Sequence, residues 1–275
     1  MKIAPILRPL NAVVRVPGSK SLTNRALLIS ALANGETRLA NALFSDDSRY
    51  FAQALQTLGF DVRLEETSRE MTVKGLGGKI PASKADLFIG NAGTAARFLS
   101  AFLTLGRGEY VLDGDPRMRQ RPIGDLAEAL TQLGANIQPI LNSEFRIQNS
   151  ITCPPVKIIA NGLRGGKTKI AGDISSQFLS ALLMVAPYAQ SPVEIEVAGE
   201  LNSKPYVDMT AAVMKDFGVE IRRSGYQWFS VPIAAYRPPT GRYPIESDAS
   251  AASYFFAAPA VCGGKIGRAS CRERV

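Results

Sequence analysis

Four short polar clusters stand where the chain turns into an apolar run, and two of them carry Lys or Arg. They are residues 17–25, 91–97, 173–177 and 246–250. Small hydroxyl and amide side chains are typical of helix starts, where backbone N–H groups lack partners and the helix dipole is positive. Such positions bind anions. Four of them in one chain predict a shared site for a ligand that carries phosphate and carboxylate groups.

The clusters recur at a nearly constant spacing. Matching points before the apolar runs are separated by 72, 80 and 77 residues, at Arg25, Arg97, Gln177 and Tyr254. A second marker, a helix-ending glycine followed by a strand pattern, occurs at Gly59, Gly134 and Gly218. Strand–glycine–helix patterns also recur in unrelated α/β proteins. Because two independent markers keep the same period, we expect an α/β fold of three units of about 75 residues, each βαβαββ.

The positions of the helices follow from the caps and the apolar spacing. The second unit shows the pattern most clearly, with Leu126, Leu130 and Leu133 at helical intervals. Thr94 and either Ser175 or Ser176 are of the types that cap helices. Prolines in residues 232–243 indicate a linker, and the cluster at Glu246 begins a further unit. The expected helices are 19–33, 46–58, 94–104, 124–133, 176–186 and 206–217, and the strands of the first unit are 37–41, 61–64 and 71–74.

The composition excludes several classes of chemistry. The chain has 275 residues, of which 46% are hydrophobic and 20% charged, so it is expected to fold into a globular protein. It contains no histidine, which excludes Ser-His triads and a histidine base and leaves Lys, Glu, Asp or Tyr for proton transfer. The three cysteines show neither metal spacing nor a disulfide framework. We find no signal peptide or membrane-spanning run and therefore expect a cytoplasmic protein.

The formal charge of +8 is also typical of nucleic-acid-binding proteins. In those proteins the basic residues form runs or stripes, whereas here only Arg222 and Arg223 are adjacent. A small anionic substrate explains the excess as well, and the helix-start clusters favour it. We therefore expect small-molecule substrates, with no nucleic-acid or membrane partner.

The last ten residues, 266–275, differ from the sequence before them. They contain three arginines and interrupt the apolar strand that is expected after Gly264. Their sequence is that of a translated sequencing-library adapter. Our hypothesis is that residues 266–275 are a foreign tail on a truncated gene product, which a sequence of the source locus beyond Lys265 would test.

Six motifs together resemble the 5-enolpyruvylshikimate-3-phosphate synthase family, the 3-phosphoshikimate 1-carboxyvinyltransferases. They occur in the family's order along residues 3–265, and two of them, PRMRQRPIG and SKPYVD, are especially specific. The resemblance implies the N-terminal part, about 60%, of such a protein. The six motifs are residues 17–25, 87–97, 116–124, 172–183, 203–208 and 248–255.

The resemblance implies an enolpyruvyl transferase-like fold of two lobes. Residues 17–241 would form one complete lobe, and residues 1–16 with 242–265 would be fragments of the second, incomplete lobe. The family transfers the enolpyruvyl group of phosphoenolpyruvate to the 5-hydroxyl of shikimate 3-phosphate, releases phosphate and uses no metal or cofactor. This step leads to chorismate and the aromatic amino acids. We expect a monomer, and we expect this chain alone to be inactive because the family's catalytic acid and base lie in the other lobe.

The matching motifs assign binding residues to both substrates. For shikimate 3-phosphate the resemblance implies Lys20, Ser21, Arg25, Ser175, Ser176, Gln177, Ser203 and Tyr206. For phosphoenolpyruvate it implies Lys20, Asn91, Gly93, Thr94, Arg121 and Gln177, with Arg97 and Asp248 in supporting roles. Arginine suits both ligands because its planar fork matches carboxylate and phosphate groups.

Simpler explanations stay open for several of these residues. Ser175 and Ser176 are also explained as helix caps, and Tyr206 as a core residue. Lys20 and Arg121 are also explained as solvated surface charges, and Asp248 as part of a hinge between the lobes.

The family's inhibitor glyphosate reaches the pocket beside the position of Gly93. Ala96 and Phe98 stand where many members have Met and Pro, so the sensitivity of this protein to glyphosate is left open. The alternatives to the family are an anion- or RNA-binding repeat module and the related UDP-N-acetylglucosamine enolpyruvyl transferase. The latter has a Lys-Asn pair where this chain has Lys20-Ser21, and a catalytic cysteine in a loop that Cys153 does not match.

Overall fold

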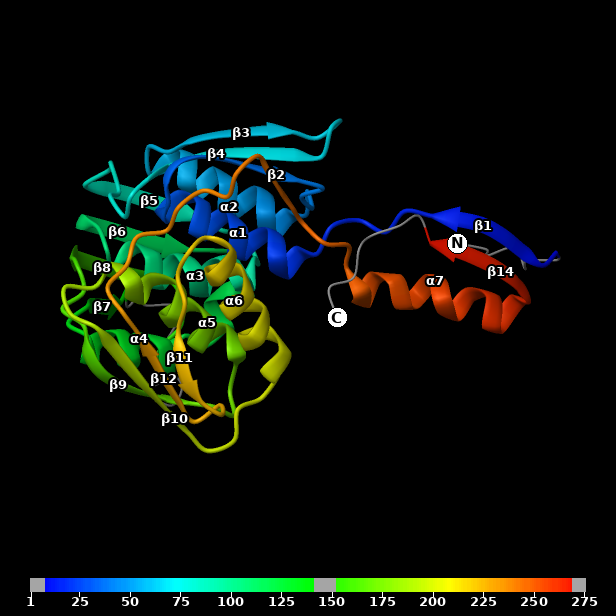
Figure 1. Ribbon diagram of the computed structural model, residues 1–275. Helices are drawn as coiled ribbons and strands as arrows, with labels where there is room; N and C mark the ends of the chain where they lie inside the picture. Colours follow the sequence, from blue (N-terminus) through cyan, green and yellow to red (C-terminus); the bar gives the residue numbers. More distant parts are fainter. Residues whose placement is uncertain (1–7, 141–151, 269–275) are drawn as a thin grey trace.

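The protein is an α/β structure in which three four-stranded sheets surround a layer of helices (Figure 1). This computed structural model describes residues 8–140 and 152–268. Each sheet belongs to one unit of the repeat. The predicted α/β class and its three units are confirmed, since all three sheets have the same pattern of strand pairing.

The first unit contains two helices and three strands in sequence. Its sheet has the order β13-β2-β4-β3. The outer strand β13 comes from beyond the third unit and pairs in parallel with β2. The elements are α1 (Lys20–Leu32), β2 (Asn34–Ala40), α2 (Asp46–Thr57), β3 (Asp61–Glu65), β4 (Glu70–Leu76) and β13 (Arg242–Pro244).

The second unit supplies all four of its strands from one stretch of chain. Its sheet has the order β5-β6-β8-β7, with β5 and β6 parallel and the other pairs antiparallel. The elements are β5 (Lys84–Phe88), α3 (Gly93–Leu103), β6 (Arg107–Asp113), the 3₁₀ turn η1 (Met118–Gln120), α4 (Gly124–Gln132), β7 (Asn136–Pro139) and β8 (Val156–Asn161).

The third unit repeats the second. Its sheet has the order β9-β10-β12-β11, again with the first pair parallel. The elements are β9 (Gly166–Ala171), α5 (Ser176–Val185), the 3₁₀ turn η2 (Ala186–Tyr188), β10 (Val193–Ala198), α6 (Lys204–Asp216), β11 (Arg222–Ser224) and β12 (Trp228–Val231).

The first helix of each unit forms the core. Every residue of α3 is buried, as is every residue of α5 except Gln177 and all of α1 from Thr23 onward. A helix that is apolar around its whole circumference must be enclosed by other elements. Here α1, α3 and α5 lie inside the three sheets, so their N-terminal residues are held in a rigid frame.

The segment expected to be a linker is well ordered by contacts with the core. Tyr236 is fully buried, its hydroxyl donates to the Met184 carbonyl at 2.9 Å, and its backbone N–H donates to the Tyr188 hydroxyl at 3.1 Å. The end of the segment forms β13, which closes the sheet of the first unit. The sheet therefore includes three residues beyond the expected boundary at residue 241.

A smaller piece projects from this body at one side (Figure 1). It consists of β1 (Leu10–Val14), α7 (Ala249–Cys262) and β14 (Gly264–Arg268), with β1 and β14 paired in parallel. The expectation that residue 266 interrupts the strand is wrong: pairing continues through Arg268, because the main chain supplies the hydrogen bonds whatever the side chains. Residues 269–275 of the predicted foreign tail lie outside the described residues.

Two crossing segments join the projecting piece to the body. Ser19 N–H donates to the Glu246 carbonyl at 2.7 Å, and Asp248 N–H donates to the Pro17 carbonyl at 2.9 Å. Gly18 lies between them, where a Cβ would be 1.9 Å from the Asn41 carbonyl oxygen. The backbone can cross here only because residue 18 has no side chain.

Candidate functional site

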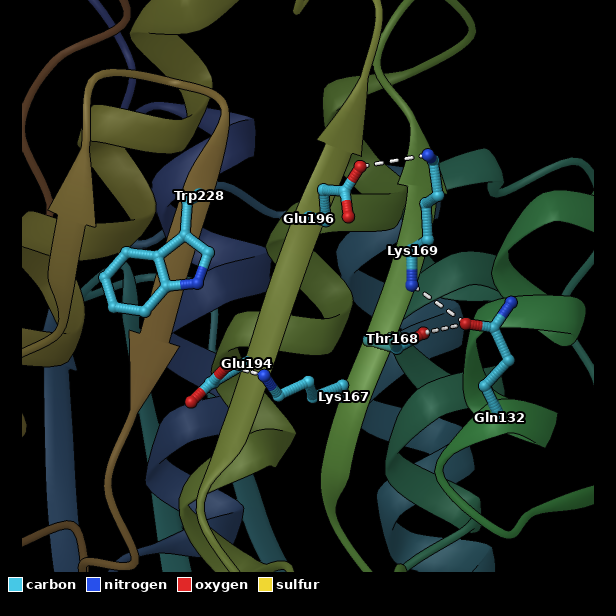
Figure 2. Close-up of a pocket in the computed structure, with 7 residues that line it drawn as sticks. All are labelled: Gln132, Lys167, Thr168, Lys169, Glu194, Glu196 and Trp228. Carbon is cyan, nitrogen blue, oxygen red and sulfur yellow. Dashed lines mark hydrogen bonds and ion pairs between the residues drawn. The ribbon is translucent and has the colours of Figure 1, made fainter.

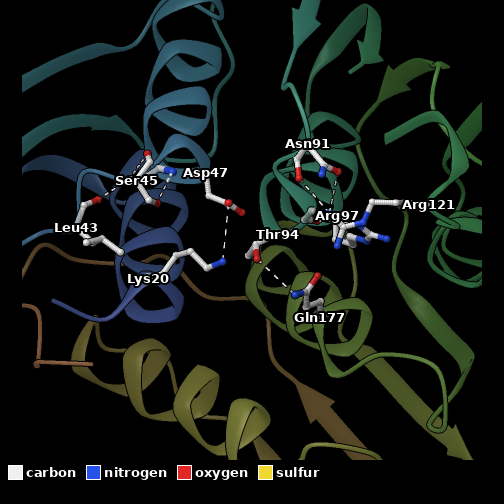
Figure 3. Close-up of polar contacts among 11 residues, drawn as sticks. Lys20, Leu43, Ser45, Asp47, Asn91, Thr94, Arg97, Arg121 and Gln177 are labelled. Atoms are coloured by element: carbon white, nitrogen blue, oxygen red, sulfur yellow. Dashed lines mark hydrogen bonds and ion pairs between the residues drawn. The ribbon is translucent and has the colours of Figure 1, made fainter. Parts of the chain in front are cut away.

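Several of the predicted residues lie in one region around the starts of α1, α3 and α5 (Figure 3), namely Lys20, Asn91, Thr94, Arg97, Arg121 and Gln177. Ser19 caps α1, and Ser175 caps α5. The Oγ of Ser175 accepts from the Gln177 N–H at 3.2 Å. The expectation that Thr94 caps α3 is wrong. Ala92 is the N-cap of α3 and has no side chain that could make a capping bond, and Thr94 is already the second residue of the helix. The start of α3 therefore keeps its positive dipole end without a side-chain cap.

Gly93 and Arg121 are in direct contact at the start of α3. A Cβ on residue 93 would lie 2.5 Å from the Nη1 and Nη2 atoms of Arg121. The Arg121 Nη1 donates to the backbone carbonyl of Asn91 at 3.0 Å and to its Oδ1 at 3.3 Å. The absence of a side chain at Gly93 thus allows a guanidinium to lie against the helix start. Asn91, Gly93 and Arg121 are brought together, as the resemblance implied.

Arg97 lies behind this contact, one turn into α3. Only 6% of it is exposed. Its Nη1 donates to the Gly93 carbonyl and its Nη2 to the Pro122 carbonyl, both at 2.9 Å. Its buried Nε has no hydrogen-bond partner among the described residues. Arg97 therefore connects the two segments that carry Gly93 and Arg121.

The Arg97 charge is not neutralised by a carboxylate of the described residues. Burial, with the positive charge of Arg121 nearby, lowers the pKa of the Arg97 guanidinium to about 10, so it is still charged at neutral pH. Its guanidinium also lies 5.9 Å from the centre of the Phe178 ring. Two adjacent cations beside an uncapped helix start favour an anion.

Two further contacts join α3 to α5 and α1 to α2 (Figure 3). Gln177 Nε2 donates to the Thr94 hydroxyl at 3.4 Å. The Lys20 ammonium lies 3.9 Å from an Asp47 carboxylate oxygen, and about half of its side chain is exposed. Lys20, Thr94 and Gln177 therefore come from three different helices.

Arg25, which the resemblance assigned to shikimate 3-phosphate, is enclosed by side chains of the body. It is 1% exposed and reaches away from solvent toward α5 and α6. Its guanidinium also lies over the rings of Phe98 at 5.4 Å and Tyr206 at 5.8 Å. Burial lowers its pKa to about 10. It donates four hydrogen bonds, to the Thr210 hydroxyl (2.7 Å), the Ser21 carbonyl (3.0 Å), the Ser180 hydroxyl (3.1 Å) and the Tyr206 carbonyl (3.1 Å).

The three predicted phosphate-binding serines lie at the starts of α5 and α6. Ser175 caps α5, while Ser176 is buried at 6% exposure. Ser203 is exposed and is the N-cap residue of α6, but its side chain makes no capping hydrogen bond, and its backbone is left-handed at φ 57° and ψ 45°. Tyr206 follows in α6 and is 40% exposed, so it is not a core residue. The hydroxyl of Ser203 is therefore available to a ligand.

Asp248 lies at the junction with the projecting piece. Its carboxylate caps α7 by accepting from the Ala251 N–H at 3.1 Å. Its backbone belongs to the crossing with residue 17 described above. In this position Asp248 stabilises the junction between the body and the projecting piece.

Several residues at the site were missed from the sequence. Asp47 faces Lys20, and Ser180 and Thr210 bind Arg25. The sequence contained one weak signal for Ser180 and Thr210. Each is a hydroxyl on an otherwise apolar helix face, and a buried hydroxyl indicates that a polar partner lies nearby. That signal does not identify the partner.

A separate groove of about 310 Å³ lies on the outer face of the third sheet (Figure 2). Its charged side chains pair with one another, Lys167 with Glu194 at 3.2 Å and Lys169 with Glu196 at 2.9 Å. Trp228 lines the other side. The groove shares no residue with the helix-start site.

The described residues contain no cluster of His, Cys, Asp and Glu side chains suited to a metal ion. Within the same part of the chain, no helix has the length and apolar character that a membrane span requires.

The chain is similar to known proteins over nearly its whole length. A 3-phosphoshikimate 1-carboxyvinyltransferase of Shewanella amazonensis is 50% identical over 267 residues, which cover 97% of this chain and 60% of the relative. That of Shewanella denitrificans is 51% identical over 255 residues, covering 92% and 58%. The chain thus spans about 60% of the length of these relatives. The prediction of a truncated chain is not confirmed by these figures.

Solved structures agree with the fold. An EPSP synthase from Acinetobacter baumannii superposes with a TM-score of 0.76 at 26% identity and covers 94% of this chain and 56% of the solved chain. The fold is therefore the enolpyruvyl transferase-like α/β fold that the repeats and motifs implied. Residues 6–270 match the family described as EPSP synthase (3-phosphoshikimate 1-carboxyvinyltransferase), and the chain belongs to that family.

Proposed function

We propose that the chain carries the substrate-binding lobe of a 3-phosphoshikimate 1-carboxyvinyltransferase. The observation that carries this proposal is the cationic pocket at the start of α3. There an uncapped helix start, the buried guanidinium of Arg97 and the adjacent guanidinium of Arg121 meet without a neutralising carboxylate from the described residues. The family membership identifies the anions that such a pocket would hold.

The reaction suits these residues. The 5-hydroxyl of shikimate 3-phosphate loses its proton as its oxygen bonds to C2 of phosphoenolpyruvate, and the electrons of the C2=C3 double bond take up a proton at C3, which gives a tetrahedral adduct. Phosphate then leaves as its bond to C2 breaks, while C3 loses a proton and the double bond re-forms. The cations of this chain hold the carboxylate and phosphate groups and stabilise negative charge. We assign substrate binding, and not proton transfer, to the site residues named here, and we expect no turnover from this chain alone. An assay for released phosphate checks this.

The pocket is assigned to phosphoenolpyruvate. Arg121 and Asn91 are the groups that face the uncapped helix start, with Thr94 and Gln177 joined beside them. Lys20 lies on the neighbouring helix and is shared by both substrates. Ala96 and Phe98 are fully buried within α3, and the Phe98 ring lies against Arg25, so we propose that both leave the glyphosate pocket beside Gly93 in place.

The shikimate 3-phosphate site is assigned to the starts of α5 and α6. Ser175, Ser176 and Ser203 hold its phosphate, and Ser21, Gln177 and Tyr206 lie toward its ring. Arg25 is assigned to the same site through its contacts with Ser21 and Tyr206. Four N–H groups of Arg25 are already hydrogen-bonded within the protein. We propose that Arg25 contributes to the site mainly by holding Ser21 and Tyr206 in position.

The wider assignments follow from the same proposal. The substrates are small molecules, and we place the enzyme in the cytoplasm as a monomer that needs no cofactor. Residues 17–241, completed by β13, form the lobe. The similarity to named transferases does not favour an RNA-binding module or the UDP-N-acetylglucosamine enzyme.

Calorimetric titration of the chain tests the function. We expect shikimate 3-phosphate to bind at least tenfold more tightly than shikimate, because a charge-assisted phosphate site contributes well over 1 kcal/mol. Ser203→Ala should weaken the binding of shikimate 3-phosphate only, since the Ser203 side chain makes no capping hydrogen bond. Ser68→Ala, at an exposed serine of the first unit, is the matched control. Equal affinities for the two ligands would contradict the proposal.

A further inference from the structure

Two loops that carry the phosphate-binding serines leave the same edge of the third sheet. Residues 172–175 follow β9, and residues 199–203 follow β10. Because β9 and β10 are parallel neighbours, their carboxyl ends lie side by side. The spacing between Ser175 and Ser203 is therefore set by how these two loops are connected.

Asn202 makes that connection. Gly172 N–H donates to the Ala198 carbonyl, and Asn202 N–H donates to the Gly172 carbonyl, both at 2.9 Å. The side-chain amide Nδ2 of Asn202 then donates to the carbonyl of Asp173. This last bond extends the connection one residue closer to Ser175. Any residue could make the backbone bond, but the bond to Asp173 needs a side-chain donor of this length.

The next residue needs such a connection. Ser203 has a left-handed backbone, which is strained for a residue other than glycine. Its side chain makes no capping bond that would hold it in place. On the loop before it, Gly172 is already tightly packed, because a Cβ there would lie 2.8 Å from Val197 Cγ1 and 3.0 Å from the Glu200 carbonyl oxygen. The close packing at Gly172 restricts how the two loops fit together, and the bond from Asn202 to Asp173 joins them.

We propose that Asn202 is a positioning residue that holds the Ser203 hydroxyl at the correct distance from Ser175 and Ser176 to bind one phosphate group. This inference rests on the proposed function, which assigns the three serines to shikimate 3-phosphate. Asn202 itself does not touch the ligand. It acts through the backbone of Asp173 and through the conformation of Ser203.

Two measurements on the full chain test this role. The variant Asn202→Leu keeps the branching and the number of side-chain heavy atoms but removes the donor, and Asn136→Leu makes the same change at an exposed asparagine of β7 as the control. Calorimetry should show shikimate 3-phosphate binding about fivefold more weakly to Asn202→Leu, as expected for one lost hydrogen bond, with shikimate binding unchanged. Hydrogen exchange should become faster in residues 172–176 and 199–206 together, with the other helices unaffected.

The outcomes separate this inference from the function on which it rests. If the unaltered chain distinguishes shikimate 3-phosphate from shikimate but Asn202→Leu binds both normally, the positioning role is wrong and the function stands. If the unaltered chain does not distinguish them, the function fails, and hydrogen exchange alone decides whether Asn202 couples the loops. Unchanged exchange in the variant overturns the inference in either case.

Discussion

Arg25 and Arg97 occupy matching places in the repeat, yet their environments differ. Both lie within the first two turns of a buried helix, and both have a pKa lowered to about 10. Arg25 donates four hydrogen bonds to groups of α1, α5 and α6. Arg97 donates two, both to backbone carbonyls, and its Nε has no partner among the described residues.

The difference separates structure from binding within one repeated pattern. A buried guanidinium whose donors are satisfied stabilises the elements around it. A buried guanidinium with an unsatisfied donor, next to a second cation, is stabilised when an anion arrives. By this reasoning Arg25 holds three helices together, whereas Arg97 keeps the start of α3 positive.

Arg25→Met should have the largest effect. It leaves two hydroxyls and two carbonyls with fewer partners, so we expect the free energy of unfolding to fall by about 3 kcal/mol. Urea unfolding followed by circular dichroism measures this, with Arg107→Met, at an exposed arginine of β6, as the control. A loss below about 1 kcal/mol would show that the four hydrogen bonds do not hold the helices together.

Arg97→Met should destabilise less, by about 1 kcal/mol, because the loss of two hydrogen bonds is offset by removal of a poorly solvated charge. Its larger effect should be on ligand response. Inorganic phosphate should raise the melting temperature of Arg97→Met less than that of the unaltered chain or of Arg25→Met, because only the serine site at α5 and α6 is left intact in Arg97→Met. If phosphate stabilises Arg97→Met fully, the anion does not bind beside Arg97.

Gly93→Ala should change stability by less than about 1 kcal/mol, since only the flexible end of Arg121 must move away from the new Cβ. The displaced guanidinium loses its bonds to Asn91, so the stabilisation by phosphate should fall. Thermal unfolding with and without phosphate measures both quantities. A large loss of stability with an intact phosphate response would mean that the contact is structural.

The smallest expected effect is on the pH dependence of stability. The folded-state pKa of Arg97 is lower than in the unfolded chain, so the unfolded chain binds more protons between pH 10 and the usual pKa of arginine, above about 12. Burial of the charged Arg97 guanidinium therefore lowers the free energy of unfolding by its full amount below pH 10. This loss becomes smaller as the pH rises above 10 and the folded protein releases the proton.

Unfolding of the unaltered chain and of Arg97→Met should be compared from pH 9 to 11. The raised pKa values of half-buried Tyr188 and buried Tyr236 cause the opposite trend, but their effects cancel in the difference between the two proteins. The stability of the unaltered chain should rise relative to Arg97→Met above pH 10. If the difference in the free energy of unfolding between the two proteins stays constant with pH, burial of the Arg97 charge does not destabilise the fold.

The local part of this structure was predictable from the sequence. Helix starts are marked by cap residues, and helix ends by glycines such as Gly59 and Gly134, because these preferences act within one turn. The repeat followed from their spacing. The prediction that Ser175 is a cap was correct. The prediction for Thr94 was wrong, because the N-cap of α3 lies two residues earlier at Ala92, and so small a shift of a helix start changes few local interactions.

The long-range part was not predictable. β13 is three residues long and is a strand only because β2 offers it an edge. Arg25 contacts Ser180 and Thr210, which are 155 and 185 residues away in the chain. Its motif identifies it as a functional arginine in the family, but only the packing of α5 and α6 shows which groups it binds here. The same holds for the link between Asn202 and Asp173.

The most direct test of the two arginine environments is a phosphate titration followed by NMR of the arginine Nε–H groups. The Arg25→Lys and Arg97→Lys variants would assign the two signals. The account predicts that the Arg97 signal shifts as phosphate binds to its unpartnered Nε, while the Arg25 signal, whose Nε is bound to Thr210, stays in place. A shift of Arg25 with no change at Arg97 would contradict it.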